Sequence, residues 1–281
     1  MRPLDSQDVC AIYKVIAEFA KELGEPIHPF GIRDKNLLES AVSRQHTGFG
    51  GIQKYSDIRQ IAASLLFGIC NDHPFHNGNK RTALVCTLSF LAENGYTPQG
   101  TRHKDFEDLV LATSSHNLSS FAKNHGLEKK HSQVRDIIKR TGANCKSMDD
   151  EVDIVFHWLA RHTRHEELKE RPIPFRRLRQ ILTKFDCEFA KSPDSKISIR
   201  REVTSTQRLL GIFKRTEQLK THLTYYGENH TMDVGSLKKI RSDLHLSAKH
   251  GCDSRDFYDN QAVVDSLLVE YKNILQRLAK K

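Results

Sequence analysis

The sequence lacks any apolar run long enough to cross a bilayer. Its 281 residues are 38% hydrophobic and 28% charged, and no uncharged apolar stretch approaches the roughly 20 residues that a membrane helix needs. The first five residues, Met1 to Asp5, also lack the basic, apolar and small-residue order of a secretory signal. We therefore expect a globular cytoplasmic protein that does not span a membrane.

Cysteine is sparse, and no two cysteines form a C-x-x-C pair. Six are scattered along the chain, at positions 10, 70, 86, 145, 187 and 252. This spacing argues against a zinc ribbon and against a disulfide framework, and it predicts free, buried thiols. The sequence also lacks internal repeats and low-complexity tracts.

Positive charge is present in excess and is unevenly placed. The formal net charge is +9, but residues 1 to 130 carry 15 Lys and Arg against 14 Asp and Glu. The remainder carries 29 against 21. A half that binds a polyanion would therefore be the second half.

Residues 1 to 126 predict an all-α domain. Asp5 or Ser6, Asp34 and Asp57 each precede a segment with apolar residues at helical spacing, where their side chains would cap the helix. Further helical patterns cover residues 82 to 93, 105 to 113 and 118 to 124. The glycine-rich stretch from Thr47 to Tyr55 interrupts them and predicts a short hairpin or flap.

The rest of the chain predicts a linker and an α+β domain, so the expected protein is multidomain. Residues 127 to 150 are polar and lysine-rich, which is typical of a linker or a surface helix. In residues 151 to 281 we expect a helix after Pro174, alternating strands at 196 to 200 and near 221 to 226, and helices at 234 to 244 and 260 to 279.

The segment from His73 to Arg81 combines groups suited to phosphate chemistry. It lies between two apolar helices, so Gly78 and Asn79 fall where a helix begins and its free N–H groups favour an anion. Lys80 and Arg81 add positive charge beside that position. His73 has a side-chain pKa near the operating pH, as a base that takes a proton from a hydroxyl requires.

The whole string resembles the signature of the Fic/Doc family, H-P-F-x-[DE]-[GA]-N-[GK]-R. The similarity continues upstream through Gly31-Ile32-Arg33-Asp34 and Phe49-Gly50-Gly51, and downstream through Asn94-Gly95-Tyr96. It covers about residues 1 to 125 and implies the helical Fic/Doc fold. Lys80 replaces the second glycine of G-N-G, and the second arginine of R-x-x-R is missing, so the sequence is more similar to Doc than to AMP-transferring Fic enzymes.

The resemblance implies a role for each residue of the motif and a nucleotide triphosphate such as ATP as donor. His73 would be the base, and Phe75 would anchor the loop to the core. Gly78 and Asn79 would donate to the phosphates, which Lys80 and Arg81 would clamp. The flap formed by Phe49, Gly50, Gly51 and Ile52 would dock an extended target segment by strand addition.

Asn77 departs from the family pattern, because the resemblance implies an acidic residue there that holds Mg²⁺. An amide oxygen can ligate this hard cation, but without the charge of a carboxylate. Three interpretations stay open: a working transferase with weaker metal dependence, altered use of the donor, or a catalytically inactive binding module.

The family also has an inhibitory helix motif, [ST]-x-x-x-E-[GN], which the string from Ser89 to Asn94 matches. We expect this match to have no inhibitory role, since it falls inside the helix that follows the motif. Restraint by a separate antitoxin protein, as in Doc systems, is the expectation instead.

The second half shows a weak resemblance to the HicA family, small α+β proteins similar in fold to double-stranded RNA-binding domains. The segment Asp194-Ser195-Lys196 replaces the catalytic histidine of that family, so ribonuclease activity is not expected. Arginines of this half are candidates for binding the phosphates of RNA or DNA: Arg176, Arg177, Arg179, Arg200 and Arg201.

Three functions follow from these patterns. The leading hypothesis is a Doc-like toxin that transfers a phosphoryl group to a Ser or Thr hydroxyl of a translation factor, elongation factor Tu being implied by the resemblance alone. The second is a Fic-type enzyme that transfers AMP or another nucleotidyl group. The third is a non-catalytic protein that binds nucleic acid or an antitoxin.

Overall fold

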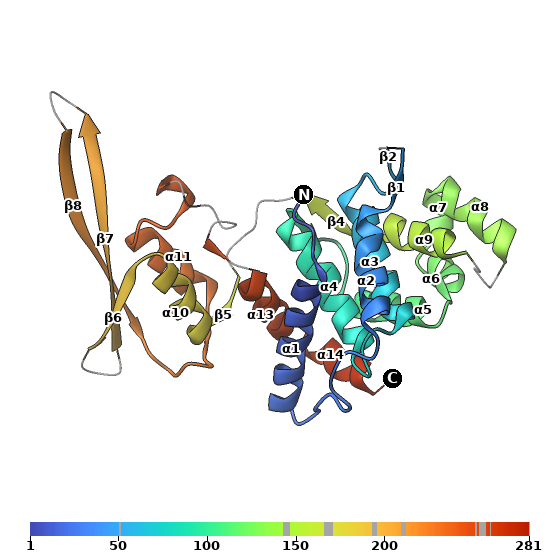
Figure 1. Ribbon diagram of the computed structural model, residues 1–281, viewed down its shortest axis with the longest axis horizontal. Coiled ribbons are helices and arrows are strands. Elements are labelled where there is room, and N and C mark those ends of the chain that lie inside the picture. Colours follow the sequence, from blue (N-terminus) through green and yellow to red (C-terminus); the bar gives the residue numbers. More distant parts are fainter. Residues whose placement is uncertain are drawn as a thin grey trace. The chain divides into compact units, whose positions relative to one another are not determined.

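The structure, a computed structural model, divides the chain into two compact units (Figure 1). Unit 1 comprises Met1–Glu167 and Leu267–Lys281, and unit 2 comprises Leu168–Ser266. No helix in the described part of the chain is both long and apolar enough to cross a membrane. The structure describes residues 1–50, 52–142, 147–165, 171–192, 196–208, 212–250, 252, 257–258 and 260–280.

Unit 1 is helical, as predicted, with short paired strands. Its helices are α1 (Ser6–Glu22), α2 (Lys35–Ser43), η1 (Arg44–His46), α3 (Ile58–Asp72), α4 (Asn79–Glu93), α5 (His103–Ser114), α6 (Leu118–Asn124), α7 (Leu127–Lys130), α8 (Ser132–Thr141), α9 (Met148–His162) and α14 (Lys272–Ala279). The predicted flap is confirmed as the antiparallel hairpin of β1 (Gly48–Phe49) and β2 (Ile52–Gln53). A second pair joins β3 (Tyr96–Pro98) to β4 (Thr163–His165).

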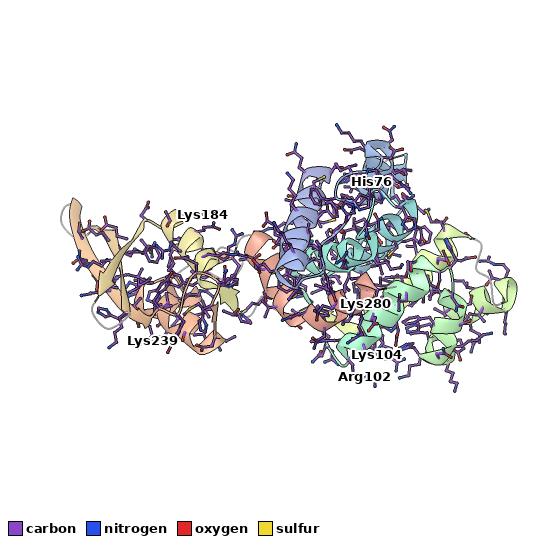
Figure 2. All side chains as sticks on the ribbon, turned by 90° about the horizontal axis from the view of Figure 1, so that it is seen from below. His76, Arg102, Lys104, Lys184, Lys239 and Lys280 are labelled. Atoms are coloured by element: carbon purple, nitrogen blue, oxygen red, sulfur yellow. The ribbon has the colours of Figure 1, made fainter. Side chains whose placement is uncertain are left out.

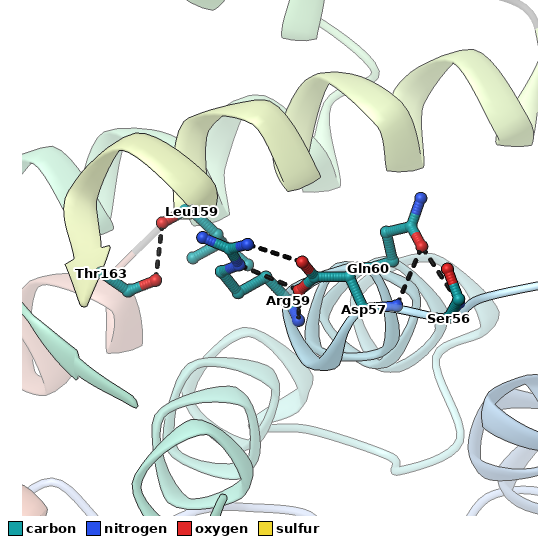
Figure 3. Close-up of polar contacts among 6 residues, drawn as sticks. All are labelled: Ser56, Asp57, Arg59, Gln60, Leu159 and Thr163. Atoms are coloured by element: carbon teal, nitrogen blue, oxygen red, sulfur yellow. Dashed lines mark hydrogen bonds and ion pairs between the residues drawn. The ribbon is translucent and has the colours of Figure 1, made fainter. Parts of the chain in front are cut away.

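Aspartates begin the first three long helices, as the sequence indicates. The Asp5, Asp34 and Asp57 side chains each accept a hydrogen bond from a main-chain N–H in the first turn. Figure 3 shows this at α3. The Asp57 side chain accepts from the Arg59 N–H, and the Gln60 side chain accepts from the Asp57 N–H. Each cap satisfies a helical N–H that would otherwise lack a partner.

Helices α3 and α4 form the centre of unit 1. They pack on one another, and α3 also contacts α2, α5 and α9. Ten of the fifteen residues of α3 are buried, and α4 has only one residue that is not. The loop between these two helices is therefore held at both ends by deeply buried helices.

The structure places the residues expected to form a linker in unit 1. Helix α8 buries Val134, Ile137 and Ile138, which recur at i, i+3 and i+4 on an otherwise polar helix. Helix α9 follows and packs on α3, and its Trp158 is fully buried. The division of the chain thus lies at residue 167 rather than between residues 126 and 151.

The C-terminal segment also departs from expectation. The helix predicted over residues 260 to 279 is two helices, α13 (Asn260–Glu270) and α14, separated at Tyr271. Helix α14 belongs to unit 1, where it packs on α4 and α5 and Arg277 donates to the buried Glu107 at 2.6 Å. Unit 2 is therefore inserted between two segments of unit 1.

Unit 2 has the α+β composition that the sequence predicts. Strands β6 (Cys187–Ser192), β7 (Lys196–Arg208) and β8 (Ile212–Thr224) form an antiparallel sheet in that order. Helix α10 (Phe175–Lys184) contacts β6, and α11 (Val234–Asp243) contacts β8. The remaining elements are the pair β5 (Ile173–Pro174) and β9 (Thr231–Met232), and η2 (Ala248–His250). Strand β6 had no clear signal in the sequence.

Candidate active site

Residues 73 to 78, here named the motif loop, join α3 to α4. Helix α3 ends at Asp72 and α4 begins at Asn79, so the loop lies between two buried helices. The left-handed backbone of His73, with φ 50° and ψ 56°, ends α3. Gly78, with φ 85°, begins α4. Two left-handed residues thus turn the chain sharply at both ends of the loop.

The side chain of Asn79 closes the motif loop. Its Oδ1 accepts from the Phe75 N–H at 2.9 Å, and its Nδ2 donates to the Phe75 carbonyl at 2.8 Å. The side chain is 8% exposed, so these bonds are shielded from water. The Asn79 side chain therefore shapes the loop, and only its main-chain N–H, in the first turn of α4, is oriented like the phosphate donors expected at this helix start.

Both the close packing around position 78 and its left-handed backbone require glycine there. A Cβ at this position would lie 2.9 Å from Cδ1 of Ile27 and 3.4 Å from a ring carbon of Tyr13. Its carbonyl accepts from both the N–H and the hydroxyl of Thr82, which fixes the first turn of α4. The loop backbone can therefore pack this closely against Ile27 and Tyr13 only with glycine at position 78.

Phe75 holds the loop on the core of unit 1. Its ring is 1% exposed and stacks on Tyr13, with centroids 4.0 Å apart. Phe30 stacks on the other side of Tyr13 at 4.9 Å. The Tyr13 hydroxyl accepts from the Gly31 N–H at 3.1 Å, so this aromatic stack also joins the loop to a second segment.

Residues 28 to 34, here named the bracing segment, lie along the motif loop. The Arg33 N–H donates to the Pro74 carbonyl at 2.7 Å, and the His76 N–H donates to the Gly31 carbonyl at 3.1 Å. No local sequence pattern predicts this contact. The string Gly31 to Asp34, which shares in the family resemblance, was the only signal of it.

His73 is half-buried at the end of α3, and the surroundings lower its pKa. Burial is the main cause, and the positive charges of Arg33 and Lys80 add to it, while Asp72 opposes them. Arg33 is held in place because its guanidinium donates to the Asp72 carbonyl at 2.9 Å. A lowered pKa keeps the imidazole neutral at pH 7, the form that accepts a proton.

Lys80 and Arg81 lie in different surroundings. Lys80 is half-buried and close enough to His73 to influence its pKa. Arg81 is 5% exposed, lies near Glu25 and Tyr13, and has its pKa lowered mainly by burial. Among the described atoms its Nε has no hydrogen-bond partner, and a buried N–H of this kind would be satisfied by an anion.

Asn77, at the position of the expected metal ligand, already uses its amide within the loop. Its Oδ1 accepts from the Gly78 N–H at 2.6 Å and its Nδ2 donates to the His28 carbonyl at 2.9 Å. The neighbouring His76 is exposed. The motif loop therefore does not fit a magnesium ion held by a carboxylate. Asn77 offers only an amide oxygen, and that oxygen already accepts the Gly78 N–H.

One group of potential metal ligands is present elsewhere in the described part of unit 1. Asp105, Asp108 and His125 place ligand atoms within 4.8 Å of one another. Both carboxylates are paired with cations, Asp105 with Arg102 and Asp108 with Lys104. Figure 2 labels the two cations. They lie on α5, outside the motif loop, so they do not supply the charge that Asn77 lacks.

The flap is a short hairpin of unit 1 that offers main-chain groups for pairing. Gly48 pairs with Gln53 and Phe49 with Ile52, and Gly50 has a φ of 59°. Lys54, directly after the hairpin, pairs with Asp149 at the start of α9. Gly51 lies outside the described residues. Within the described part of the chain, the hairpin is a separate two-stranded sheet, which leaves strand edges for an extended segment.

The string from Ser89 to Asn94 forms the last turn of α4 and its C-cap. Ser89 is fully buried, and the buried Glu93 pairs with Arg2. These residues form part of the core at the end of α4 opposite the motif loop. The match to the inhibitory motif is thus explained by packing.

Four of the five candidate arginines in unit 2 make bonds within that unit. Arg177 pairs with Asp265 and Arg179 with Glu228, while Arg201 donates to main-chain carbonyls at the ends of α10 and α11. Arg176 donates to Asn229 at 3.2 Å. Arg200 is exposed on β7, opposite Glu188 and Lys220. Their expected role in binding phosphate stays a prediction.

Comparison with known proteins agrees with the geometry of the motif loop. Residues 3–91 match the model of the Fic/DOC family. Toxin Doc of Mycolicibacterium smegmatis (strain ATCC 700084 / mc(2)155) is 35% identical over 94 residues, which are 32% of this chain and 72% of that protein. The residues that match the family model contain α1 to α3, the flap, the motif loop and all but the last two residues of α4. This chain belongs to the Fic/DOC family.

Proposed function

We propose that unit 1 transfers the γ-phosphoryl group of a nucleotide triphosphate such as ATP to a Ser or Thr hydroxyl of a protein. The observation that carries this proposal is the position of His73. It ends the buried helix α3, its pKa is lowered, and Lys80 at the start of α4 lies close to it. A neutral base and a phosphate-binding helix start thus belong to one short loop.

In this reaction the neutral imidazole of His73 takes the proton of the attacking hydroxyl. The hydroxyl oxygen forms a bond to the γ-phosphorus, and the bond from that phosphorus to the β,γ-bridging oxygen breaks. The nucleotide diphosphate leaves with that electron pair, and His73 later releases the proton to solvent. The groups proposed to hold the phosphates are main-chain N–H groups at the start of α4, Lys80, and the Nε of Arg81, which has no hydrogen-bond partner among the described atoms. No step is assigned to a metal ion.

Lys80 favours phosphoryl over nucleotidyl transfer. The family resemblance implies that the glycine of G-N-G helps to seat the α-phosphate for AMP transfer, and Lys80 fills that position. The second arginine of the AMP-transferring pattern is also missing from Arg81-Thr82-Ala83-Leu84. Nucleotidyl transfer is the second candidate activity, and binding without catalysis is the third.

The proposed partners follow from similarity to Doc. A cytoplasmic toxin of this type would be restrained by a separate antitoxin and would modify a translation factor such as elongation factor Tu. The open edges of the flap support docking of an extended target segment, because main-chain groups on a free edge can pair with a new strand.

Intact mass of a candidate target tests the reaction directly. The full chain, the target, magnesium and one nucleotide triphosphate at a time are incubated together, with the His73→Ala variant as control. We expect the mass of one phosphate to be added by the native chain only. Addition of a nucleoside monophosphate would replace the proposal with nucleotidyl transfer, and an unmodified target with every nucleotide would favour the non-catalytic function.

A further inference from the structure

Unit 2 contains a cavity of about 340 Å³ beside the end of strand β8. Its walls come from β8, the segment after it, β9 and the first two turns of α11. This volume is in the range of small-molecule sites, about 300 to 1,000 Å³. The cavity lies within unit 2 and shares no residue with the motif loop or the five candidate arginines.

The floor of the cavity is apolar. Leu223, Met232 and Ile240 line it, and each is at most 8% exposed. These side chains come from three different elements that pack together, so the floor exists without a ligand. It suits a flat, weakly polar group that gains by leaving water.

The rim carries one lysine and several aromatic rings. Lys239 of α11, His222 of β8 and His230 surround the opening, and all three are exposed. Tyr226, also on the rim, is 70% exposed, and its ring lies 4.8 Å from that of His230. An exposed aromatic pair beside a lysine can stack on a ring and hold an anion at once.

The acidic group of the cavity is already engaged. Asp233 accepts from the N–H and the hydroxyl of Ser236, at 2.9 and 2.6 Å, and so caps α11. Hydrogen bonds from Ser236 lower the pKa of this carboxyl group. The capped helix start is therefore not the anion-binding group, and that role falls to Lys239 and His222 on the rim.

The segment that carries the two rings is fixed by main-chain bonds. The Phe175 N–H donates to the His230 carbonyl, and the Arg176 N–H donates to the Glu228 carbonyl, both at 2.9 Å. Tyr226 and His230 are thus presented from an ordered turn, and binding loses little backbone entropy.

We propose that this cavity binds a nucleoside phosphate as one unit of single-stranded RNA. The base occupies the apolar floor and contacts the rings of Tyr226 and His230, and a phosphate lies at Lys239 and His222. The charge of unit 2 supports an anionic ligand, since the unit has 19 Lys and Arg against 13 Asp and Glu, a net formal charge of +6. An unpaired strand is required, because a base within a duplex cannot enter a cavity.

Fluorescence anisotropy of a labelled oligouridylate or oligoadenylate with the full chain tests the site. Tyr226→Ala should weaken binding by roughly 5- to 150-fold, the range for loss of one stacked base, and Tyr226→Phe should retain it. Lys239→Gln should weaken binding and make the salt dependence shallower by about one phosphate contact. Lys184→Gln removes the same charge from the opposite side of unit 2 (Figure 2) and should change affinity little.

Competition then identifies the form of the ligand. Displacement of the oligonucleotide by free uridine or adenosine monophosphate, lost in Tyr226→Ala, would assign the site to the nucleotide itself. No displacement by the free nucleotide would assign it to a unit within a strand. Tighter binding of duplex than of single strand, equal effects of Lys184→Gln and Lys239→Gln, or no binding at low salt would each overturn the proposal. These readouts do not involve group transfer, so they stand whether or not unit 1 is a kinase.

Discussion

The amide of Asn79 bonds to both main-chain groups of Phe75, accepting from its N–H at 2.9 Å and donating to its carbonyl at 2.8 Å. The Asn79 side chain, at the start of α4, thus makes with Phe75 the same two main-chain hydrogen bonds that a neighbouring strand would make. Asparagine is needed because its side-chain amide has both a hydrogen-bond donor and an acceptor, whereas the side chains of aspartate and leucine do not.

Asn79→Asp should destabilise unit 1 and disorder the loop. A carboxylate would lose the donated bond and face the Phe75 carbonyl in a buried site, which costs about 1 to 3 kcal/mol. Thermal unfolding of the variant measures this, with the exposed Asn36→Asp on α2 as control. An unchanged Tm with lost nucleotide binding would instead assign the Asn79 side chain to the phosphates.

His73→Ala should lower group transfer by about 10² to 10⁴, the usual effect of losing a general base. The residue is half-buried at the end of a helix, so circular dichroism and Tm should stay close to those of the native chain. His76→Ala, an exposed histidine on the same loop, should keep most of the activity. A folded His73→Ala protein with undiminished transfer would remove this residue from the mechanism.

Arg33→Gln should move the acidic limb of the pH profile to higher pH. The positive charge of Arg33 helps to lower the pKa of His73 below its ordinary value of 6.5, so its removal raises that pKa. Transfer needs the neutral imidazole and is lost as the pH falls through this pKa. The profile of kcat/KM gives the position of the limb, and the exposed Arg135→Gln is the matched control. A limb that stays in place would show that Arg33 has only a structural role.

Gly78→Ala should cost about 2 to 5 kcal/mol of unfolding free energy. The left-handed conformation accounts for about 1 to 2 kcal/mol, and overlap of the new Cβ with Ile27 adds about 1 to 3. Gly24→Ala separates the two causes, because Gly24 has a similar φ of 74° with no atom within 4 Å of its Cβ position. Equal losses in both variants would show that the contact with Ile27 is not a constraint.

Asn77→Asp should lose stability without magnesium and regain it with magnesium. The carboxylate can no longer donate to the His28 carbonyl, which costs about 1 kcal/mol, but it supplies the charge that a divalent ion needs. A magnesium titration of Tm should stabilise the variant more than the native chain. Equal stabilisation of both proteins would show that the ion does not bind at residue 77.

Local features of this fold could be predicted from the sequence. Asp5, Asp34 and Asp57 each stand before an apolar helical repeat, and a cap depends only on a few neighbouring residues. The hairpin at residues 48 to 53 and the loop between α3 and α4 follow from glycine, proline and apolar periodicity in the same way.

Features that depend on distant contacts could not be predicted. The bond from Arg33 to Pro74 joins residues about forty positions apart, and no local pattern specifies which loop a short polar segment will pair with. The apolar stripe of α8 has only three residues. Because lysines and arginines surround it in the sequence, the pattern does not predict that α8 packs in unit 1. The direction of the Asn79 side chain likewise depends on the folded loop.

The return of α14 to unit 1 has a consequence for synthesis on the ribosome. Residues 267–281 are synthesised after the whole of unit 2. The hydrogen bond between Arg277 and Glu107 can therefore form only after about 170 residues have been added beyond Glu107. Unit 1, which carries the motif loop, is therefore completed late, and a chain terminated before residue 272 would lack α14. A chain assembled in this order therefore has a delay between translation of the motif loop and completion of unit 1 around it.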